Sequence, residues 1–476
     1  MSKHKDGVIY TPPEVVDKML DMADYFPERI PGFLEMDFLD NSCGSGNILV
    51  VALERACDAI DKMCPALGFT SKQRYNYYEY WLPKHFHGME LDPDSCNECV
   101  DNLNKVVSER LNKEIHWEWD IKCCDSLTYE DNKQYDFVVC NPPYIRTHDL
   151  ECDFSGYEFV EEGMKDMYLA FYELGLRQVK PDGTLCYITP SSWFTSTAGK
   201  KFRKYLFDGR LISKIYDYGH KQVFENATTY VEITTIIRPG MTRRPNYFEY
   251  GEEGKDRRMM IPWDSVSIDG KFYFVGSYVY RAIKKIQDNK VRKIRVKNGY
   301  ATLADDVFVI GDTPWNGGDY VIPVVKSSTG NWTWCIYPYD KDGKLVSEDS
   351  LKEGSPLERV WLCENRKKLD ARATTEPWYA FGRTQAINDT YKDKWAIKSI
   401  IKTLDDINPI KAPAGTGVYG GLYILCEDES QLECLKTEEF MDYIKSLRKY
   451  KSGGYYTFSS KDLENYLNWK NYGEEA

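Results

Sequence analysis

The stretch from Asn141 to Tyr144, Asn-Pro-Pro-Tyr, combines a side-chain amide, two rigid carbonyls and a flat aromatic ring. It follows an apolar run, 135–140, that is typical of a buried parallel strand ending in a tight loop. Two consecutive prolines fix φ twice and leave carbonyls without neighbouring N–H groups. Such a rim suits a planar ring with an exocyclic amine, which would donate to the Asn141 oxygen and a proline carbonyl while Tyr144 stacks on the ring. A proline-rich turn after a strand is the alternative, and the neighbouring segments decide between the two.

A Gly-rich turn, Asp40 to Asn47, lies between a predicted strand and a predicted helix. Its small residues let the backbone approach a ligand and leave N–H groups of the helix N-terminus pointing at it. The dinucleotide spacing G-x-G-x-x-G is absent, and no Gly-Lys-Ser/Thr follows as in a phosphate loop. The Asp40 carboxylate would instead repel phosphate and favour an ammonium group. A purely structural turn is the alternative.

Two further acids follow predicted strands. Glu90 stands where a doubly wound sheet places an acceptor for both hydroxyls of a ribose. Asp125 follows the third strand, where a carboxylate can accept from an adenine amine. Each could equally be a solvated loop residue, but the order of the four segments is informative. They occupy the ends of four successive strands, all on the carboxyl edge of the expected sheet.

A parallel sheet is needed to bring these residues together, and residues 1–240 alternate strands and helices as such a sheet requires. A capped amphipathic helix is expected after Thr11, with Pro12 at its first position. Further helices are expected over 48–56 and 167–179. Strands are expected over 38–40, 85–91, 115–119, 135–140, 184–189, 214–218 and 230–237. The predicted fold is α/β, a doubly wound Rossmann-like sheet.

The alternation ends at 238–245, which has the Pro, Gly and Arg content of a domain boundary. Short strands, Gly-rich turns and many Tyr and Trp follow. A chain of 476 residues is also too long for one ordinary domain. We expect a first domain over 1–242 and a second, mixed α+β domain over 243–476.

Composition excludes several classes of protein. No stretch approaches the roughly 20 apolar residues that span a bilayer, and the polar start of the chain shows no signal peptide. Fourteen cysteines in such a chain are expected to be reduced thiols, which predicts a cytoplasmic protein. Cys96 and Cys99 have the spacing of half a zinc site, but no second pair is close, so we expect core packing and no metal.

The charge is uneven along the chain, whose formal net charge is −12. Residues 241–476 carry 36 Lys and Arg against 35 Asp and Glu, whereas the preceding residues carry 26 against 39. An acidic protein can still bind nucleic acid if its basic groups are clustered where the phosphates lie. Such clusters occur in the second half of the chain.

The order of these segments resembles the DNA adenine-N6 methyltransferases of the gamma motif order, typical of type II restriction-modification systems. The resemblance is strong before residue 240 and patchier after 245. The segments that carry it are 11–16, 40–46, Glu90, Asp125, 141–144 and 219–224, followed by 379–385 and 453–459, which are similar to parts of the family's target-recognition region.

The resemblance implies S-adenosylmethionine as methyl donor and double-stranded DNA as substrate. By position, Thr11 and Asp40 would contact the methionine moiety of the donor, Glu90 its ribose and Asp125 its adenine. Asn141 would border both donor and target base. The turn residues that would pack against the donor are Ser42, Cys43, Gly44 and Gly46.

An adenine amine is a poor nucleophile because its lone pair is delocalised into the ring. Acceptors at Asn141 and the Pro142 carbonyl would polarise both N–H bonds and favour a tetrahedral nitrogen, without a covalent intermediate. The base must be flipped out of the duplex, at about a few kcal/mol. Tyr144 and Phe224, at the place of the family's second aromatic clamp, would sandwich it at roughly 1–3 kcal/mol per stacking contact.

Because the active site would require a DNA duplex, we expect runs of basic residues to contact its phosphates. The run 281–297 includes Lys293, Arg295 and Lys297, and a weaker cluster includes Arg366 to Lys368 and Arg372. Arg383 and Gln385 carry side chains able to read guanine and adenine edges. We expect the second domain to recognise the DNA target and the protein to act as a monomer on DNA, with any cognate restriction endonuclease acting separately.

Other functions share parts of this pattern. A protein glutamine N5-methyltransferase can use the same Asn-Pro-Pro-Tyr rim but does not need residues 243–476. DNA cytosine-N4 methyltransferases more often carry Ser in place of Asn141. A specificity subunit without catalysis is disfavoured by the presence of Asn141, Asp40 and Glu90. No motif of a fused endonuclease is recognisable.

Overall fold

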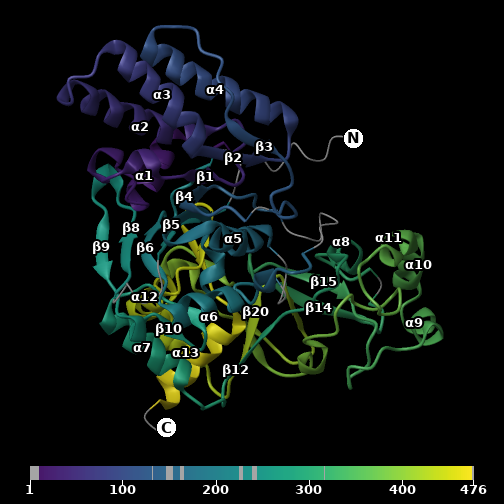
Figure 1. Cartoon of the computed structure of the whole chain (residues 1–476). Helices are drawn as coiled ribbons and strands as arrows, with labels where there is room; N and C mark the ends of the chain where they lie inside the picture. Colours follow the sequence, from purple (N-terminus) through teal and green to yellow (C-terminus); the bar gives the residue numbers. More distant parts are fainter. Residues whose placement is uncertain are drawn as a thin grey trace. The chain divides into compact units, whose positions relative to one another are not determined.

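The computed structural model describes residues 10–130, 132–145, 154–160, 166–224, 229–237, 244–315 and 317–473. The chain divides into two compact units, Met1–Tyr280 and Arg281–Ala476, whose elements are labelled in Figure 1. The boundary expected between residues 242 and 243 lies outside the described residues. The units divide later in the chain because β8 (Asn246–Glu249) and β9 (Arg257–Met260) pair with the sheet of unit 1.

Unit 1 is built on one nine-stranded sheet with the order β3-β2-β1-β4-β5-β7-β6-β8-β9. The first five strands in this order are parallel, and β7 runs antiparallel to both of its neighbours. This arrangement confirms the predicted doubly wound α/β sheet. Its other strands are β1 (Phe38–Asp40), β2 (Phe86–Glu90), β3 (Asp120–Cys123), β4 (Tyr135–Cys140), β5 (Val179–Pro190), β6 (Ile212–Asp217) and β7 (Val231–Ile236).

The third strand is the exception to the predicted positions. It was expected over 115–119, whereas β3 begins at Asp120, which lies opposite His87 of β2. The Asn104 side chain accepts the backbone N–H of Trp117 at 2.9 Å and the indole N–H of Trp119 at 3.0 Å. Because a side chain of the preceding helix satisfies these donors, the apolar segment packs without joining the sheet.

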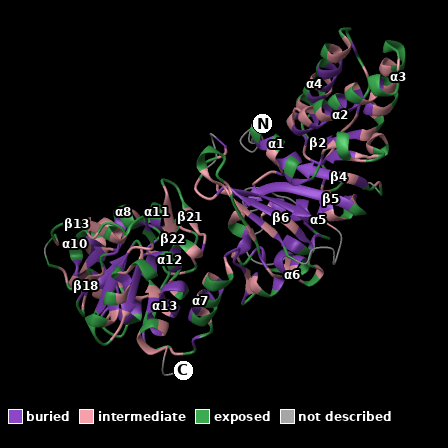
Figure 2. Cartoon of the chain, turned by 90° about the vertical axis from the view of Figure 1, so that its left-hand side faces the viewer, coloured by how far each residue is buried: buried purple, intermediate pink, exposed green. Residues whose placement is uncertain are grey.

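Helices cover both faces of this sheet and bury it in two cores. Apolar residues of α1 to α4 pack on one face and those of α5 and α6 on the other. The central strands β4 and β5 are largely buried in Figure 2. These helices are α1 (Pro13–Met22), α2 (Asn47–Ala66), α3 (Ser71–His85), α4 (Pro93–Leu111), α5 (Met167–Gln178) and α6 (Lys200–Gly209). Helix α7 (Ser277–Asp288) begins at the end of unit 1 and continues into unit 2.

Helix α1 begins one residue later than predicted, at Pro13, with Pro12 as its N-cap and without a side-chain hydrogen bond to cap it. Pro13 occupies its first turn, where no N–H is needed, and the Pro12 carbonyl accepts the N–H groups of Val15 and Val16. Its apolar stripe is buried against the sheet. No helix among the described residues has the length and apolar content to cross a bilayer.

Unit 2 has the mixed α+β character that the sequence predicts. Short strands form two four-stranded sheets, β12-β20-β16-β18 and β13-β15-β14-β19, and a three-stranded sheet, β17-β22-β21. The strands are β12 (Arg295–Asn298), β13 (Val309–Gly311), β14 (Val321–Lys326), β15 (Trp332–Ile336), β16 (Lys394–Ile397), β17 (Ile400–Ile401), β18 (Ile410–Ala412), β19 (Gly417–Tyr419), β20 (Leu422–Leu425), β21 (Tyr450–Lys451) and β22 (Tyr455–Thr457). The helices are α8 (Asp305–Phe308), α9 (Glu348–Gly354), α10 (Pro356–Glu364), α11 (Arg366–Asp370), α12 (Glu438–Ser446) and α13 (Ser460–Tyr472), and the small hairpin β10 (Ser267–Ile268) and β11 (Lys271–Phe272) precedes this unit.

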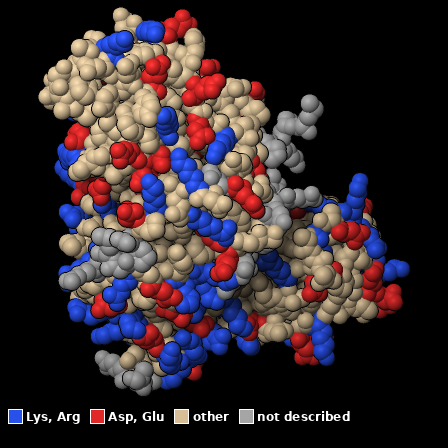
Figure 3. Space-filling model, viewed as in Figure 1, with Lys and Arg blue, Asp and Glu red and all other residues tan. Residues whose placement is uncertain are grey.

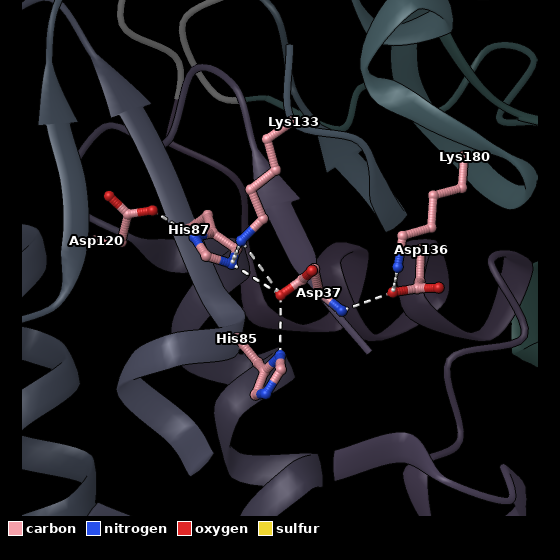
Figure 4. A network of polar contacts seen from close by, with 7 residues as sticks. All are labelled: Asp37, His85, His87, Asp120, Lys133, Asp136 and Lys180. Carbon is pink, nitrogen blue, oxygen red and sulfur yellow. Dashed lines mark hydrogen bonds and ion pairs between the residues drawn. The ribbon is translucent and has the colours of Figure 1, made fainter. Parts of the chain in front are cut away.

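A polar network joins the amino ends of the parallel strands (Figure 4). One oxygen of Asp37 lies 2.9 Å from His85 Nδ1, 3.1 Å from His87 Nε2 and 3.4 Å from Lys133 Nζ. The buried His87 also contacts Asp120 at 2.6 Å through Nδ1. Burial alone would raise the pKa of Asp37, but the hydrogen bonds from the two histidines and the charge of Lys133 lower it well below its ordinary value.

Replacing Asp37 with Asn should therefore destabilise unit 1 in a pH-dependent way. A carboxyl whose pKa is lowered by folding stabilises the protein above its unfolded pKa and loses that contribution as the pH falls. We expect Asp37→Asn to lower the free energy of unfolding by about 2 kcal/mol at pH 7, and the difference should shrink below pH about 4. Urea unfolding followed by circular dichroism measures this.

The matched control is Asp208→Asn, which removes an exposed carboxylate that pairs with Lys204 on α6. Exposed pairs contribute little, so this variant should unfold within about 0.5 kcal/mol of the wild type. Equal stability of Asp37→Asn and the wild type at pH 7 would show that the network does not stabilise the sheet.

Candidate active site

Four loops that follow neighbouring parallel strands meet at one edge of the sheet of unit 1. Phe38 of β1 lies opposite Phe86 of β2 and Phe137 of β4, and β3 is in parallel register with β2. The loops after these strands therefore leave the sheet together, at the edge where doubly wound folds bind ligands. They contain the nominated residues Asp40, Glu90, Asp125 and Asn141.

Glu90 links the first two of these loops. One carboxylate oxygen accepts the backbone N–H of Gly44 at 2.9 Å. The other accepts the N–H groups of Leu91 at 2.9 Å and Asp92 at 3.0 Å. Since a carboxylate offers about four acceptor sites, Glu90 can still accept from a ligand while it shapes the loop around the ligand.

Asp40 is buried at the end of β1, with 1% of its surface exposed. Its carboxylate accepts the N–H of Ser42 at 3.2 Å. Burial, followed by the negative charge of Glu90, raises its pKa to about 7, although hydrogen bonds from Cys140 and Ser42 lower it in part. Within the part of the chain that the structure describes, no Lys, Arg or His lies within ion-pair distance of Asp40. Such a carboxyl suits a cationic ligand.

The Gly-rich turn has the backbone that its sequence predicts. Gly44 and Gly46 adopt left-handed φ values of 52° and 88°. A Cβ on Gly46 would lie 2.7 Å from the Cys99 sulfur, so α4 leaves no room for a side chain there. A Cβ on Gly44 would meet nothing within 4 Å, which leaves open space beside this part of the turn. The turn is held to β2 by the N–H of Cys43, which donates to the Met89 carbonyl at 2.9 Å.

The cysteines of α4 pack inside the protein. Cys96 and Cys99 are both buried, and the Cys96 thiol donates to the Glu90 carbonyl at 3.5 Å. Within the described ranges, no three His, Cys, Asp or Glu side chains are arranged to hold a metal ion.

The loop after β3 places Asp125 at the surface and its neighbour inside. Asp125 is exposed and accepts the N–H of Leu127 at 3.0 Å. The buried Ser126 donates from its hydroxyl to the Asn41 carbonyl at 2.7 Å and so ties this loop to the Gly-rich turn.

Asn41 and its partners were not nominated from the sequence. The buried Asn41 amide donates to Gln178 Oε1 at 2.8 Å and to the Tyr187 hydroxyl at 2.7 Å. These bonds anchor the Gly-rich turn to α5 and β5. A polar residue directly after an apolar strand was the available signal, but its partners lie more than 130 residues away in the chain.

Asn141 connects two predicted motifs that are far apart in the sequence, the loop 141–144 and the segment that begins at Thr11. Its side-chain amide donates to the Thr11 hydroxyl at 3.0 Å, which connects the loop after β4 with the residues before α1. The Tyr144 hydroxyl donates to the Ile188 carbonyl at 2.9 Å, which fixes the other end of the loop to β5. Pro142 between them is buried. The loop is thus held at both ends.

The rings of Tyr144 and Phe224, the residues predicted to form an aromatic clamp, contact each other. Their ring centres are 6.2 Å apart and the rings are inclined by 58°, while Tyr168 meets Tyr144 edge-on at 6.5 Å. A base between two parallel rings needs about 7 Å, twice the contact distance between carbon atoms. Phe224 is only 3% exposed. In this state the two rings contact each other and leave no room for a base between them.

The nominated basic residues of unit 2 differ in their surroundings. Lys293 is exposed, and its ammonium lies 4.3 Å from the centre of the Tyr472 ring. Arg295 is exposed and lies 3.2 Å from Glu464. Both side chains reach the surface, although Arg295 has an acidic partner that competes with a phosphate.

Lys297 belongs to a buried hub instead. It donates to Asp389 at 2.5 Å, and Asp389 also accepts from Lys392 at 2.7 Å and the Tyr423 hydroxyl at 2.8 Å. Burial would raise the pKa of Asp389, but these hydrogen bonds lower it to about 2. The buried Lys394 donates to the backbone carbonyl of Asp389 at 2.9 Å. Lys297 therefore stabilises unit 2 in the described state.

Arg383 and Gln385 are exposed on the segment that leads into this hub. The backbone N–H of Arg383 donates to the Ala301 carbonyl at 3.0 Å, and the Gln385 amide donates to the Gly299 carbonyl at 3.1 Å. Arg372 of the weaker basic cluster donates to the backbone carbonyls of Thr302, Leu369, Trp378 and Ala380. The Arg372 guanidinium thus has a structural role, and the Gln385 amide also holds the backbone, whereas the Arg383 side chain is exposed.

Known proteins are similar to this chain in sequence. Residues 52–224 match the family model of the Eco57I restriction-modification methylase. The type II restriction enzyme and methyltransferase RM.Eco57I of Escherichia coli is 23% identical over 516 residues, covering 87% of this chain and 51% of its own. The type II methyltransferase M.BanIII of Aneurinibacillus aneurinilyticus is 33% identical over 269 residues, covering 47% and 44%.

Solved structures agree on the fold. The type IIL restriction-modification enzyme MmeI in complex with DNA superposes with a TM-score of 0.64 at 13% identity, covering 94% of this chain and 63% of that one. The chain spans about half the length of RM.Eco57I and M.BanIII. These comparisons confirm the resemblance to methyltransferases of type II restriction-modification systems and the Rossmann-like fold with a second unit.

Proposed function

We propose that this chain transfers a methyl group from S-adenosylmethionine to N6 of an adenine in double-stranded DNA, as the modification activity of a restriction-modification system. The main support is the doubly anchored loop 141–144 beside the buried carboxyl of Asp40, which has no cationic partner among the described residues. Type II methyltransferases are among the relatives of this chain. An enzyme with this substrate would act in the cytoplasm as a monomer on DNA, with any restriction endonuclease separate.

The residues at the carboxyl edge fit this methyl donor. The donor carries an electrophilic methyl group on a sulfonium centre, together with an ammonium group. Asp40, buried without a cationic partner in the described chain, would pair with the ammonium. Glu90 would accept hydrogen bonds from the ribose hydroxyls, and the exposed Asp125 would accept one from the adenine amine. The open space beside Gly44 would admit the part of the donor that lies against the backbone of the turn.

The amino group of the target adenine would bind at the loop 141–144. The hydrogen bond from Asn141 Nδ2 to Thr11 turns the amide oxygen away from Thr11, as an acceptor for one amine proton. The Pro142 carbonyl accepts the other, and together they favour a tetrahedral nitrogen. Tyr144 is held by Ile188 for stacking on the flipped base, whereas Phe224 must first separate from it.

Two alternative functions, glutamine N5-methylation and cytosine N4-methylation, are disfavoured by different observations. A glutamine N5-methyltransferase would use the same rim but leave unit 2, with its own cores and exposed Arg383 and Gln385, without a substrate to recognise. A cytosine-N4 methyltransferase is disfavoured by the amide at position 141. Sequencing that detects modified bases in DNA from cells expressing the chain distinguishes all three.

Asn141→Ala should abolish most methyl transfer, because one of the two acceptors for the amine is lost. We expect tritiated methyl incorporation into duplex DNA to fall by about 10²–10³, while calorimetry still detects binding of S-adenosylmethionine. Asn76→Ala removes an exposed amide from α3 and should leave both unchanged. Turnover retained by Asn141→Ala would contradict the role assigned to the loop.

The raised pKa of Asp40 predicts a pH dependence of donor binding. Only the ionised carboxylate attracts an ammonium, so affinity for S-adenosylmethionine should be full above pH about 7 and fall as the pH drops below it. The fall should approach about tenfold per pH unit. Calorimetry at pH 6 and pH 8 measures it, and Asp40→Asn should bind weakly at both. Equal wild-type affinity at the two values would argue against this pairing.

We propose further that the DNA backbone lies along the basic face of α7 and the residues after it. Figure 1 labels α7, and Figure 3 shows how Lys and Arg side chains occur on the surface. Arg281, Lys285 and Lys290 are exposed, and within the described residues no acidic side chain pairs with them. Lys293 and Arg295 continue this face.

Arg281→Ala combined with Lys285→Ala should weaken DNA binding and flatten its salt dependence. Each lost phosphate contact lowers the slope of log affinity against log salt by about 0.9, so the double variant should lose about 2. Fluorescence anisotropy over a salt series measures the slope. Lys62→Ala with Lys105→Ala removes the same charge from exposed sites on α2 and α4. If both double variants keep the wild-type slope, the α7 face does not contact DNA.

A further inference from the structure

Glu232 is a charged residue in the otherwise uncharged strand β7, and its side chain is completely buried. Its Oε1 accepts from the Thr189 hydroxyl at 2.9 Å and the Trp193 indole at 2.8 Å. Its Oε2 lies 2.5 Å from the Thr234 hydroxyl. Across the described residues, no Lys, Arg or His pairs with it. An unpaired buried carboxyl is costly and calls for a physical explanation.

The residues that Glu232 holds are those that support Tyr144. Thr189 and Trp193 belong to the end of β5 and the turn η6 (Ser191–Phe194). Ile188, next to Thr189, accepts the Tyr144 hydroxyl at 2.9 Å. From the same turn, Ser192 lies 3.4 Å from the hydroxyl of Tyr168, whose ring meets Tyr144 edge-on. Two routes therefore connect this turn with the Tyr144 ring.

We infer that Glu232 is a positioning residue for the flipped base: by holding the segment Ile188–Trp193, it keeps the Tyr144 ring in place to stack on the base. This inference rests on the proposed function and adds to it a residue that does not itself contact the substrate. Glu232 lies opposite Thr189 in the antiparallel pairing of β5 and β7. Both the backbone and the side chain of Glu232 therefore hold Thr189 in place.

The protonation state of Glu232 follows from its surroundings. Burial raises its pKa to about 8, while hydrogen bonds from Thr234, Trp193 and Thr189 lower it in part and the charge of Asp217 raises it. The other titratable groups near it are Tyr144, Tyr168 and Tyr172, all neutral at pH 7. The carboxyl is therefore mostly protonated at pH 7, and its Oε1 accepts from Thr189 and Trp193 as the amide oxygen of a glutamine would.

This assignment gives a signed pH dependence. A carboxyl whose pKa is raised by folding stabilises the native state at low pH and loses that contribution as the pH rises through its folded pKa. Above pH 8, Glu232 ionises beside Asp217, and no Lys, Arg or His of the described residues lies within ion-pair distance of it. The Arg203 guanidinium binds the Trp193 carbonyl on the same turn and does not form an ion pair with Glu232. The segment that supports Tyr144 is then expected to shift. Glu232→Gln keeps the neutral hydrogen-bond pattern at every pH.

The test compares the wild type, Glu232→Gln and Glu232→Leu on a duplex with 2-aminopurine at the target position. Base trapping and methyl transfer by the wild type should fall about tenfold per pH unit above 8, whereas Glu232→Gln should keep both. Glu232→Leu should trap the base at least about fivefold more weakly at pH 7, with affinity for S-adenosylmethionine unchanged by calorimetry.

Glu173→Gln is the matched control, because Glu173 is a buried acid of α5 that binds Phe159 and Arg177 instead of this turn. It should keep the alkaline loss of the wild type. If Glu232→Gln shares that loss, the positioning role is overturned, even when Glu232→Leu fails to fold. A wild type that neither traps the base nor methylates DNA would overturn the proposed function, and the positioning role with it.

Discussion

The parallel register of β1, β2, β3 and β4 is the constraint on which the rest of this molecule depends. Because these strands end at one edge, four loops that are far apart in the chain become neighbours. Hydrogen bonds then join the loops to one another: Glu90 binds Gly44, Ser126 binds Asn41, and Asn141 binds Thr11. A ligand at this edge meets a surface that is already assembled.

Local sequence patterns were sufficient to predict most of unit 1, because its strands and helices follow from apolar runs and caps. The patterns failed where a distant partner decides the outcome. The segment before β3 was expected to be a strand, yet the Asn104 side chain takes its donors. The pairing of β8 with β6 likewise joins segments that only the folded chain brings together.

The candidate site, too, could be predicted only in part from the sequence. Asp40, Glu90 and Asn141 could be nominated because each follows a readable strand, and the positive φ of Gly44 and Gly46 follows from their residue type. The burial of Asp40, with no cationic partner in the described parts of the chain, could not be foreseen, nor could the contact between Tyr144 and Phe224. Among the basic residues, sequence could not separate Lys297, which binds Asp389, from its exposed neighbours.

The hub around Asp389 has a consequence for the stability of unit 2. Lys297 of β12, Lys394 of β16 and Tyr423 of β20 all donate hydrogen bonds to Asp389. These three strands are neighbours in one sheet, so a single turn residue fastens all of them. A substitution of Asp389 would therefore loosen the three strands together, whereas the loss of any one of its partners would free only one strand.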